Sequence, residues 1–391
     1  MERFTAVERA LRRAAPHALL EAVQGALAAH YAAESVDLLM ADYAMTILQP
    51  VSALPYTAEP VPVHTSAPGR AFGAQEPYVE TDKRTGSATA HLPISVRGDR
   101  LGVLSVRLRA DALDEATAGE LADVAEVLGY GIVVAERDTD LYLQARRADR
   151  LTLAAEMQWQ LLPGRSCSRP EYDLGAQLEP AYAIYGDNFD WSTSADHLTL
   201  TVTNGMGEGI EAALLTNLAI NALRNARRAG LSLTDQVCLA DQAVYGHYQG
   251  AVHLSVLHLR FDLATGETEI IDAGSPKMWR LRHGKAEPIE LEAQLPLGMF
   301  EDTVYTVQRF QVEAGDRLLF VSDGVYDVAS PAGERYSERA LVRAMANTRL
   351  LPPSQVPRAV LQELSGHRGP IDADDDAMVV CLDWHGRPPA G

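Results

Sequence analysis

The ten residues GDRLLFVSDG at positions 315–324 indicate how the C-terminal half of this chain folds. Their apolar run predicts a buried strand over Asp316–Ser322. The Asp323-Gly324 pair predicts a loop directly after that strand, because aspartate and glycine both favour turns. A carboxylate is therefore expected at the point where a buried strand ends.

Similar polar positions accompany other predicted strands. Asp187 lies in the stretch GDNFD at 186–190, Asn204-Gly205 follows a predicted strand at 197–202, and three aspartates at 374–376 precede another. One Asp-Gly pair alone is usually only a turn, so the inference depends on their joint order. Carboxylates that converge from several strand ends form a hard-oxygen site that suits Mg²⁺ or Mn²⁺. The sequence thus predicts a divalent metal site.

Residues 166–391 alternate strands and helices in an order typical of an α+β sandwich, because strands connected as hairpins surround helices that occur in groups. A parallel βαβ sheet is not indicated. The predicted strands are 174–178, 197–202, 253–259, 267–272, 316–322 and 377–383, and the predicted helices are 208–229, 232–248, 337–346 and 356–364.

Residues 1–135 have a different pattern, which predicts a separate α+β domain. Helices are expected over 4–33, divided at Pro16, and over 114–134, with a hairpin formed by His91–Val96 and Leu101–Leu108 between them. The stretches ATAHLPIS (88–95) and GVLSVR (102–107) resemble the final hairpin of a GAF sensor domain. The resemblance implies a small-molecule sensor, and a packing or dimerisation module without a ligand stays open.

Residues 136–165 are expected to connect the two domains as one continuous helix over Ala135–Leu162. Leu141, Ala148, Ala155 and Leu162 are spaced by seven, which predicts either a parallel coiled coil or an amphipathic helix packed on its own domain. The first choice implies a homodimer through the 141–162 helix. Pro163-Gly164 ends the helix, and Cys167–Glu171 is predicted to be a linker into the domain at 166–391.

The composition limits the classes of partner. The chain of 391 residues carries 53 acidic and 34 basic side chains and a formal net charge of −19, which repels phosphate backbones and anionic lipids. Neither nucleic acid nor a membrane is expected as a partner. No export signal or membrane-spanning stretch is apparent, and Cys167, Cys238 and Cys381 lack the spacing of a disulfide framework. We expect a cytoplasmic protein.

The C-terminal segment resembles the metal-dependent protein serine/threonine phosphatases of the PPM family, above all the bacterial branch typified by stage II sporulation protein E. The landmarks occur in family order: EMQWQLLP at 156–163, GDNFD at 186–190, GMGEG at 205–209, AGSP at 273–276, LPLG at 295–298, GDRLLFVSDG at 315–324 and the aspartates at 374–375. The resemblance implies an α/β/β/α sandwich. It also implies a site for Mn²⁺ or Mg²⁺ that holds two ions or fewer. A water at this site would attack the phosphorus of a phosphoserine.

The same resemblance implies which residues act. Asp187 and Asp323 are metal carboxylates, together with Asp374 or Asp375, and Gly205 offers its backbone carbonyl.

One departure from the family pattern bears on catalysis. Asn204 stands where the family has an aspartate that bridges both ions, so an oxygen ligand is kept and a negative charge is lost. Metal binding should weaken. Two functions stay open: a phosphatase acting on a phosphorylated regulatory protein such as an anti-sigma-factor antagonist, and a pseudophosphatase that binds a regulatory partner without hydrolysing it.

Overall fold

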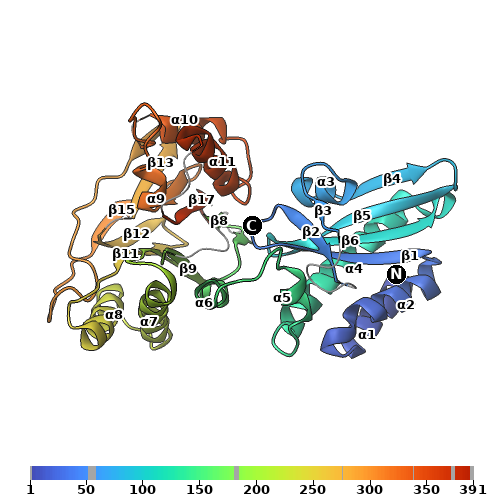
Figure 1. Cartoon of the computed structure of the whole chain (residues 1–391), viewed down its shortest axis with the longest axis horizontal. Coiled ribbons are helices and arrows are strands. Elements are labelled where there is room, and N and C mark those ends of the chain that lie inside the picture. Colours follow the sequence, from blue (N-terminus) through green and yellow to red (C-terminus); the bar gives the residue numbers. More distant parts are fainter. Residues whose placement is uncertain are drawn as a thin grey trace. The chain divides into compact units, whose positions relative to one another are not determined.

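The computed structural model describes residues 2–51, 59–179, 185–274, 276–337, 339–370 and 375–387. The chain forms two compact units, Met1–Arg150 and Leu151–Gly391 (Figure 1). We refer to them as unit 1 and unit 2 and describe each by itself.

Unit 1 is one antiparallel sheet with helices packed on it. In the described residues the sheet has six strands in the order β3-β2-β1-β6-β5-β4. The strands are β1 (Ser35–Ala41), β2 (Ile47–Pro50), β3 (Val61–Pro62), β4 (Tyr78–Asp82), β5 (Ser87–Val96) and β6 (Asp99–Arg109). The helices are α1 (Glu2–Arg13), the 3-10 turn η1 (Pro16–Ala18), α2 (Leu19–Tyr31), α3 (Ala67–Ala74), the 3-10 turn η2 (Ala110–Ala112), α4 (Glu115–Ala135) and α5 (Leu141–Ala145).

The local sequence explains the main elements of unit 1. The predicted hairpin is confirmed as β5–β6, and its two turn residues, Arg97 and Gly98, both have positive φ, which matches the right-handed twist of the strands. The division of the first helix near Pro16 is also confirmed. Asp114 caps α4 by accepting the amide of Thr117 at 2.8 Å, and the buried side of α4 joins α1, α2 and the sheet in one apolar core.

Unit 2 consists of two antiparallel sheets packed face to face. In the described residues one sheet has the order β15-β12-β11-β10-β9 and the other β14-β13-β16-β17-β8-β7. The strands are β7 (Ser166–Arg169), β8 (Tyr172–Glu179), β9 (Asn188–Thr193), β10 (His197–Asn204), β11 (Ser255–Asp262), β12 (Glu267–Ala273), β13 (Lys277–Arg282), β14 (Lys285–Pro288), β15 (Gln308–Gln311), β16 (Arg317–Val321) and β17 (Ala377–Trp384). The helices are α6 (Leu153–Leu161), α7 (Gly209–Arg228), α8 (Leu233–Tyr248), α9 (Asp323–Tyr326), α10 (Ala340–Asn347) and α11 (Val356–Arg368).

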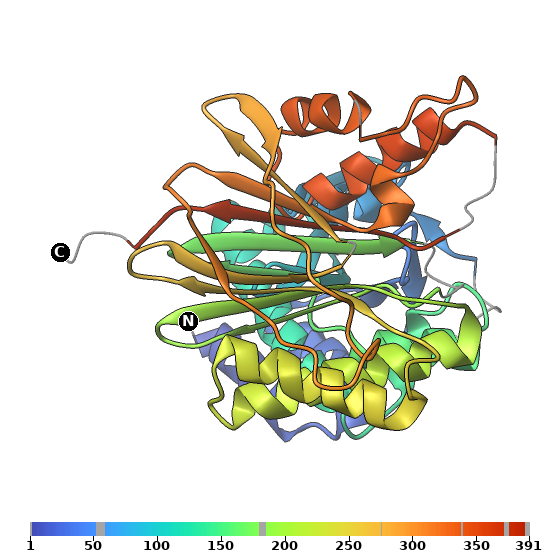
Figure 2. The ribbon, with the colours of Figure 1, turned by 90° about the vertical axis from the view of Figure 1, so that its left-hand side faces the viewer.

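Helices cover the outer face of each sheet, which confirms the predicted α/β/β/α sandwich for this unit. Figure 2 shows α7 and α8 on the β9–β12 side and α10 and α11 on the β16–β17 side. The central strands are buried on both faces. In β10 the residues Leu198, Leu200 and Val202 join the core between the sheets, while the alternate Thr201 bonds His258 of β11 on the side of α8.

The predicted linker at Cys167–Glu171 is wrong, because most of it is strand. Residues 166–169 form β7 and pair with β8 as an edge hairpin, in which Cys167 is buried in the core between the sheets. The segment has no run of apolar residues, so its own sequence gives little sign of a strand.

The predicted continuous helix over Ala135–Leu162 is also wrong. Helix α4 ends at Ala135 and the short helix α5 covers only Leu141–Ala145. Beyond α5 the carbonyls of Arg146 and Arg147 accept hydrogen bonds from Tyr43 N and Gln49 Nε2 within unit 1. Thr152 then starts α6 by capping the amide of Ala155 at 3.2 Å. Ala155 is fully buried in unit 2 against Ala213, so it cannot form part of a coiled-coil seam. The homodimer predicted through the 141–162 helix loses the helix on which it depended.

Candidate metal centre

The predicted metal residues lie where both sheets of unit 2 present strand ends to each other. Asp187 directly precedes β9, and Asn204-Gly205 ends β10, which is the antiparallel neighbour of β9. Asp323 follows β16, and Asp376 precedes β17, which pairs with β16. Hairpin and neighbour pairing therefore bring together residues that are up to 189 positions apart in the chain.

Asp376 fixes the loop that carries Asp187. Its side chain is fully buried, and Oδ2 accepts the amides of Tyr185, Gly186 and Asp187 at 2.8, 3.0 and 3.2 Å. A carboxylate that accepts several backbone amides acts as an anchor, because each charged hydrogen bond is stronger than a neutral one. Asp376 thus links the two sheets across the site.

The glycines at the site allow the loops to approach each other closely. A Cβ atom at Gly205 would lie 2.4 Å from the carbonyl carbon of Gly186, and a Cβ atom at Gly324 would lie 1.9 Å from the carbonyl oxygen of Asp376. Neither position can hold a larger residue without moving the backbone. The Asn-Gly and Asp-Gly pairs in the sequence therefore reflect packing between loops as well as turn formation.

Asp187 is nearly fully buried and points one oxygen at the glycine loop. Its Oδ1 accepts the amide of Gly205 at 3.2 Å, and its backbone carbonyl accepts a hydrogen bond from Gln158 of α6. Within the described part of the chain, Asp187 Oδ2 and Asp376 Oδ1 are buried oxygens that have no hydrogen-bond partner. Buried carboxylate oxygens without a donor are costly unless a cation or a proton compensates them.

The pKa shifts of the two buried aspartates reflect the free-energy cost of burying their charges. Burial raises the pKa of Asp187 well above its usual value, and the nearby carboxylate of Asp376 raises it further. An interaction with the Ser322 side chain opposes the shift, and Asp375 and Asp323 add to it. Burial also raises the pKa of Asp376, although its bonds from the loop amides oppose this shift. Three other carboxylates thus act on Asp187, and no arginine or lysine is among the largest causes of these two pKa shifts within the described residues.

This donor set fits a divalent cation. No group of three or more His, Cys, Asp and Glu side chains has the arrangement of a complete metal site within the residues that the structure describes, and Asp374 is not among them. The chemistry of the groups present still suits such an ion, because they are hard oxygen donors with two unpaired buried oxygens. Asp187 and Asp376 stand at the centre of the site, and Asp323 and Asp375 stand beside them.

The other predicted residues lie at the ends of the neighbouring strands. Asn204 is buried at the end of β10 opposite Ser255, beside the loop that carries Asp187. Asp323 is half-buried, and its Oδ1 accepts the amide of Gly324. Asp375 is half-buried and accepts the amide of Asp376 at 2.8 Å. Asp374 lies outside the described residues.

Two further residues contribute to the site in ways that the sequence alone does not indicate. In the sequence Asp376 is one member of the aspartate run at 374–376, and only the fold shows that its carboxylate reaches the 185–187 loop. Gln158 lies in the stretch EMQWQLLP without a predicted role, and it reaches the carbonyl of Asp187. By contrast, Asp190, in the same stretch as Asp187, is paired with Arg224 at 2.7 Å and Arg227 at 3.0 Å and holds α7 against β9.

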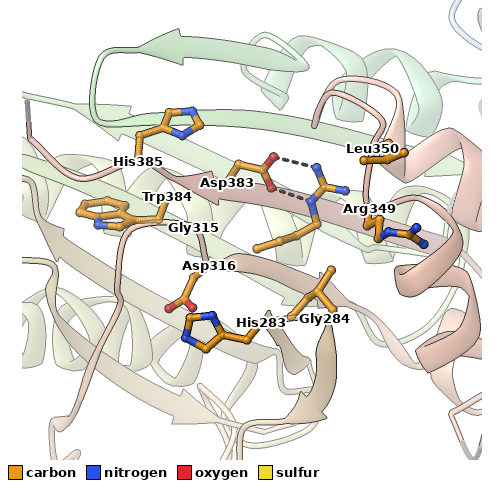
Figure 3. A pocket seen from close by; sticks show the side chains of 11 residues that line it. His283, Gly284, Gly315, Asp316, Arg349, Leu350, Asp383, Trp384 and His385 are labelled. Carbon is orange, nitrogen blue, oxygen red and sulfur yellow. Dashed lines mark hydrogen bonds and ion pairs between the residues drawn. The ribbon is translucent and has the colours of Figure 1, made fainter.

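A hollow of about 390 Å³ lies at the opposite ends of β16 and β17 (Figure 3). Asp383 faces it, but the carboxylate is already held by Arg317 through two bonds of 2.6 and 2.7 Å, drawn as dashed lines. Asp316 is held in the same way by Arg282. The carboxylates at this end are therefore neutralised by the protein itself, and they are not a second metal centre.

The described part of the chain has no helix long and apolar enough to cross a membrane.

Two sheets between two pairs of helices, with carboxylates at one end of the sandwich, define a fold of the PP2C-type phosphatase domains. Unit 2 is similar to the SiaA-PP2C domain of Pseudomonas aeruginosa, with a TM-score of 0.50 and 19% sequence identity over 59% of this chain and 93% of that one. It is also similar to the RsbU and RsbW domains of Rv1364c from Mycobacterium tuberculosis, with a TM-score of 0.50 and 23% identity over 56% and 62%.

The sequence comparison finds similarity to the same kind of phosphatase domain. Residues 194–385, slightly less than half of the chain, match the family model of stage II sporulation protein E (SpoIIE). The chain is 22% identical to the phosphoserine phosphatase RsbU of Bacillus subtilis over 208 residues, which is 53% of this chain and 62% of that protein. It is 22% identical to protein IcfG of Synechocystis over 257 residues, which is 58% of this chain and 40% of that protein. The chain thus spans less than two thirds of these relatives.

Proposed function

We propose that unit 2 is a divalent-metal-dependent protein phosphatase that hydrolyses a phosphoserine ester on a regulatory protein. The observation that carries the proposal is the pair of buried aspartates, Asp187 and Asp376, each with an unpaired oxygen. Support for the reaction class comes from the PP2C-type fold and from the similarity to a phosphoserine phosphatase.

The chain's own residues give the site its shape. Asp376 holds the 185–187 loop through three amides, and the amide of Gly205 holds one oxygen of Asp187, which leaves the other oxygen free for a cation. Bound Mn²⁺ or Mg²⁺ would supply positive charge that offsets these carboxylates and the phosphoryl oxygens. Hydrolysis then forms a bond from water oxygen to phosphorus, breaks the bond from phosphorus to the serine oxygen, and leaves a proton on that oxygen.

The direct test is hydrolysis of a phosphoserine peptide by the purified chain with Mn²⁺. Wild type is expected to release phosphate, and Asp187→Asn is expected to lose that activity. Asp196→Asn is a matched control, since Asp196 is an exposed aspartate in the turn between β9 and β10, away from the site. Equal rates for Asp187→Asn and wild type would contradict the proposal.

Asn204 favours a second candidate, a pseudophosphatase that binds a regulatory partner without hydrolysing it. The residue is buried beside the Asp187 loop and brings no negative charge to the site. The two functions are separated by comparing wild type with Asn204→Asp in the same Mn²⁺ assay. An inactive wild type and an active Asn204→Asp variant would favour the pseudophosphatase, whereas equal robust rates would show that Asn204 does not weaken the site.

The remaining parts of the proposal concern the signalling context. We assign the substrate to the class of anti-sigma-factor antagonists, unit 1 to a GAF-like sensor, and the protein to the cytoplasm. The test of the substrate is dephosphorylation of a purified phosphorylated antagonist, with a phosphoserine peptide of unrelated sequence as the control.

A further inference from the structure

The start of α7 carries a row of exposed apolar side chains beside the candidate metal centre. Met206, Ile210 and Leu214 are four residues apart, and they are 44%, 49% and 43% exposed. Ile210 and Leu214 lie on one face of the helix, because residues four apart are neighbours on a helix surface. Met206 directly follows Gly205, whose amide bonds Asp187 at 3.2 Å. We call Met206, Ile210 and Leu214 the α7 row.

The opposite face of the same helical turns supports the loop of the metal centre. Thr216 Oγ1 donates to the carbonyl of Gly186 at 2.7 Å, and a Cβ atom at Gly186 would lie 3.2 Å from the Cβ atom of Ala212. Gly186 directly precedes Asp187 in the chain. The α7 row therefore lies on the outer side of the turns that hold the Asp187 loop, and the core of unit 2 does not cover it.

The charges beside the α7 row are acidic. Residues 205–223 contain Glu208 and Glu211 and no lysine, arginine or histidine. Both glutamates are exposed, and neither forms an ion pair within the residues that the structure describes. Helices α6 and α8, which both pack on α7, carry three acidic residues, one histidine and no lysine or arginine. This surface therefore suits a partner with basic side chains around an apolar patch.

The position of the α7 row decides which molecule covers it. A phosphoserine that reacts beside Asp187 brings the rest of its protein against the surface around the site. A specific protein partner covers about 800 Å² on each side, the area of a disc with a radius of about 16 Å. Leu214 is five residues from the start of α7 at Gly209, or about 8 Å along the helix axis. A protein substrate therefore covers the α7 row, whereas a short peptide can occupy the metal centre without reaching Leu214.

We propose that the α7 row is the docking site for the phosphorylated protein on which unit 2 acts. The partner has an apolar patch next to its phosphoserine, and basic side chains at the border of this patch meet Glu208 and Glu211. The inference rests on the phosphatase function proposed for unit 2, and it adds the contact that distinguishes a phosphoprotein from an isolated phosphoserine peptide. The apolar contact contributes affinity, and the charges contribute orientation and a faster association rate.

The test compares two substrates of the full chain in the presence of Mn²⁺. One is a purified phosphorylated anti-sigma-factor antagonist, and the other is a short peptide with the sequence around its phosphoserine. Wild type is expected to have a kcat/KM at least about tenfold higher for the protein. Leu214→Glu places a charge in the apolar row and is expected to remove this advantage by raising KM for the protein, while kcat/KM for the peptide stays the same.

The matched control is Leu350→Glu. Leu350 is also an exposed leucine of unit 2, at 85%, and it lines the hollow at the opposite ends of β16 and β17. This variant is expected to keep the wild-type kcat/KM for both substrates. Peptide hydrolysis also checks that each variant is folded and that its metal centre is intact.

A salt series tests the acidic border of the α7 row. The ratio of kcat/KM for the protein to kcat/KM for the peptide is expected to fall as NaCl is raised, because salt screens exposed charges. In the double variant Glu208→Gln/Glu211→Gln this ratio should be lower at low salt and should change less with NaCl. The ratio is the readout because it cancels effects of salt on the metal centre itself.

Several results would overturn the docking site. Wild type might be found to hydrolyse the peptide as efficiently as the protein, or Leu214→Glu to lower both rates equally, and either result would remove the role in docking. A ratio in Leu214→Glu equal to that in Leu350→Glu would place the contact elsewhere. A wild-type dimer that Leu214→Glu converts to a monomer, measured by light scattering, would assign the row to a second copy of this chain.

Failure of the phosphatase function gives a different result. In that case wild type hydrolyses neither substrate, and the docking site is tested by the Kd for the phosphorylated antagonist, measured by titration calorimetry. Leu214→Glu is then still expected to weaken binding at least about tenfold, and Leu350→Glu is expected to leave it unchanged. Equal Kd values for wild type and Leu214→Glu would overturn the docking site as well.

Discussion

The two ends of β16 and β17 carry buried or half-buried aspartates whose charges are compensated in different ways. At one end, Asp383 and Asp316 are bonded by Arg317 and Arg282 at 2.6–2.7 Å. At the other end, the Asp376 carboxylate accepts three backbone amides and has no arginine or lysine partner within the residues that the structure describes, and it lies beside Asp187. The same pair of strands therefore has one end that the protein compensates by itself and one end where we propose that a cation from solution does so.

Removing one charge at each end should separate the two cases most strongly. Asp187→Asn should lower the rate of phosphoserine hydrolysis by about a hundredfold or more, because the loss of one metal carboxylate removes several kcal/mol of transition-state stabilisation. It should nevertheless raise the melting temperature without metal, since a buried and poorly compensated charge is removed. Asp383→Asn should lower the melting temperature, because the buried Arg317 loses its charged partner. Shifts of the same sign in a metal-free thermal melt would contradict this comparison.

Arg317→Ala should destabilise unit 2 by about 3–5 kcal/mol, the usual cost of removing one partner of a buried ion pair. The guanidinium also donates to the carbonyls of Thr348 and Leu351 at 2.7 and 2.8 Å, so both would lose a donor. The measurement is urea unfolding, and the matched change is Arg317→Met with Asp383→Leu, which removes both charges. That double variant should be less destabilised than Arg317→Ala, and the opposite order would argue against the ion pair as the cause.

Added metal should stabilise the protein by binding at the Asp187 and Asp376 end of β16 and β17, where arginine partners are lacking among the described residues. Mn²⁺ at a hundred times its Kd should stabilise the folded chain by about 2.7 kcal/mol, as expected for a ligand that binds the folded state alone. The melting temperature of wild type should rise with Mn²⁺, and that of Asp187→Asn should rise less. If both rise equally, the ion binds away from Asp187.

A third buried group avoids charge altogether, and near neutral pH its contribution to stability is the smallest of these effects. His258 lies between Thr201 and Gln236, bonded at 2.9 and 3.0 Å, and burial lowers its pKa to about 3. Because the folded state keeps this ring neutral while the unfolded state takes up a proton below about pH 6.5, stability should fall with falling pH from about 6.5 towards 3. The slope from this residue is at most about 1.4 kcal/mol per pH unit. His258→Asn should flatten the dependence of urea midpoints on pH, and an unchanged dependence would exclude His258 as its source.

The central elements of unit 2 could be predicted because their sequences are locally distinctive. Strands such as 197–202 and 316–322 are apolar runs between polar turns, and both helices that cover the β10–β11 face follow a helical period. Strands β7, β9, β13, β14 and β15 were not predicted, since they are short and all except β13 lie at sheet edges, where pairing replaces apolar patterning.

The period of seven over 141–162 predicted one continuous helix that the structure does not form. The spacing is compatible with one helix, but the carbonyls of Arg146 and Arg147 accept hydrogen bonds from Tyr43 and Gln49, and these tertiary bonds replace helical ones where α5 ends. At the metal centre, Asp187, Asn204 and Asp323 were predicted as polar residues at strand ends. The role of Asp376 was not, because it comes from bonds to amides that are far away in the chain.

The sequence alone determined the α+β class, the main strands of the sandwich and the positions where carboxylates end them, because apolar period and turn residues act over a few neighbouring positions. Only the tertiary structure decided which aspartates lie together, which of them an arginine neutralises, and that the chain breaks its helix before Thr152. These features depend on contacts between residues far apart in the chain, and the free energy of burying a charge is set by those contacts.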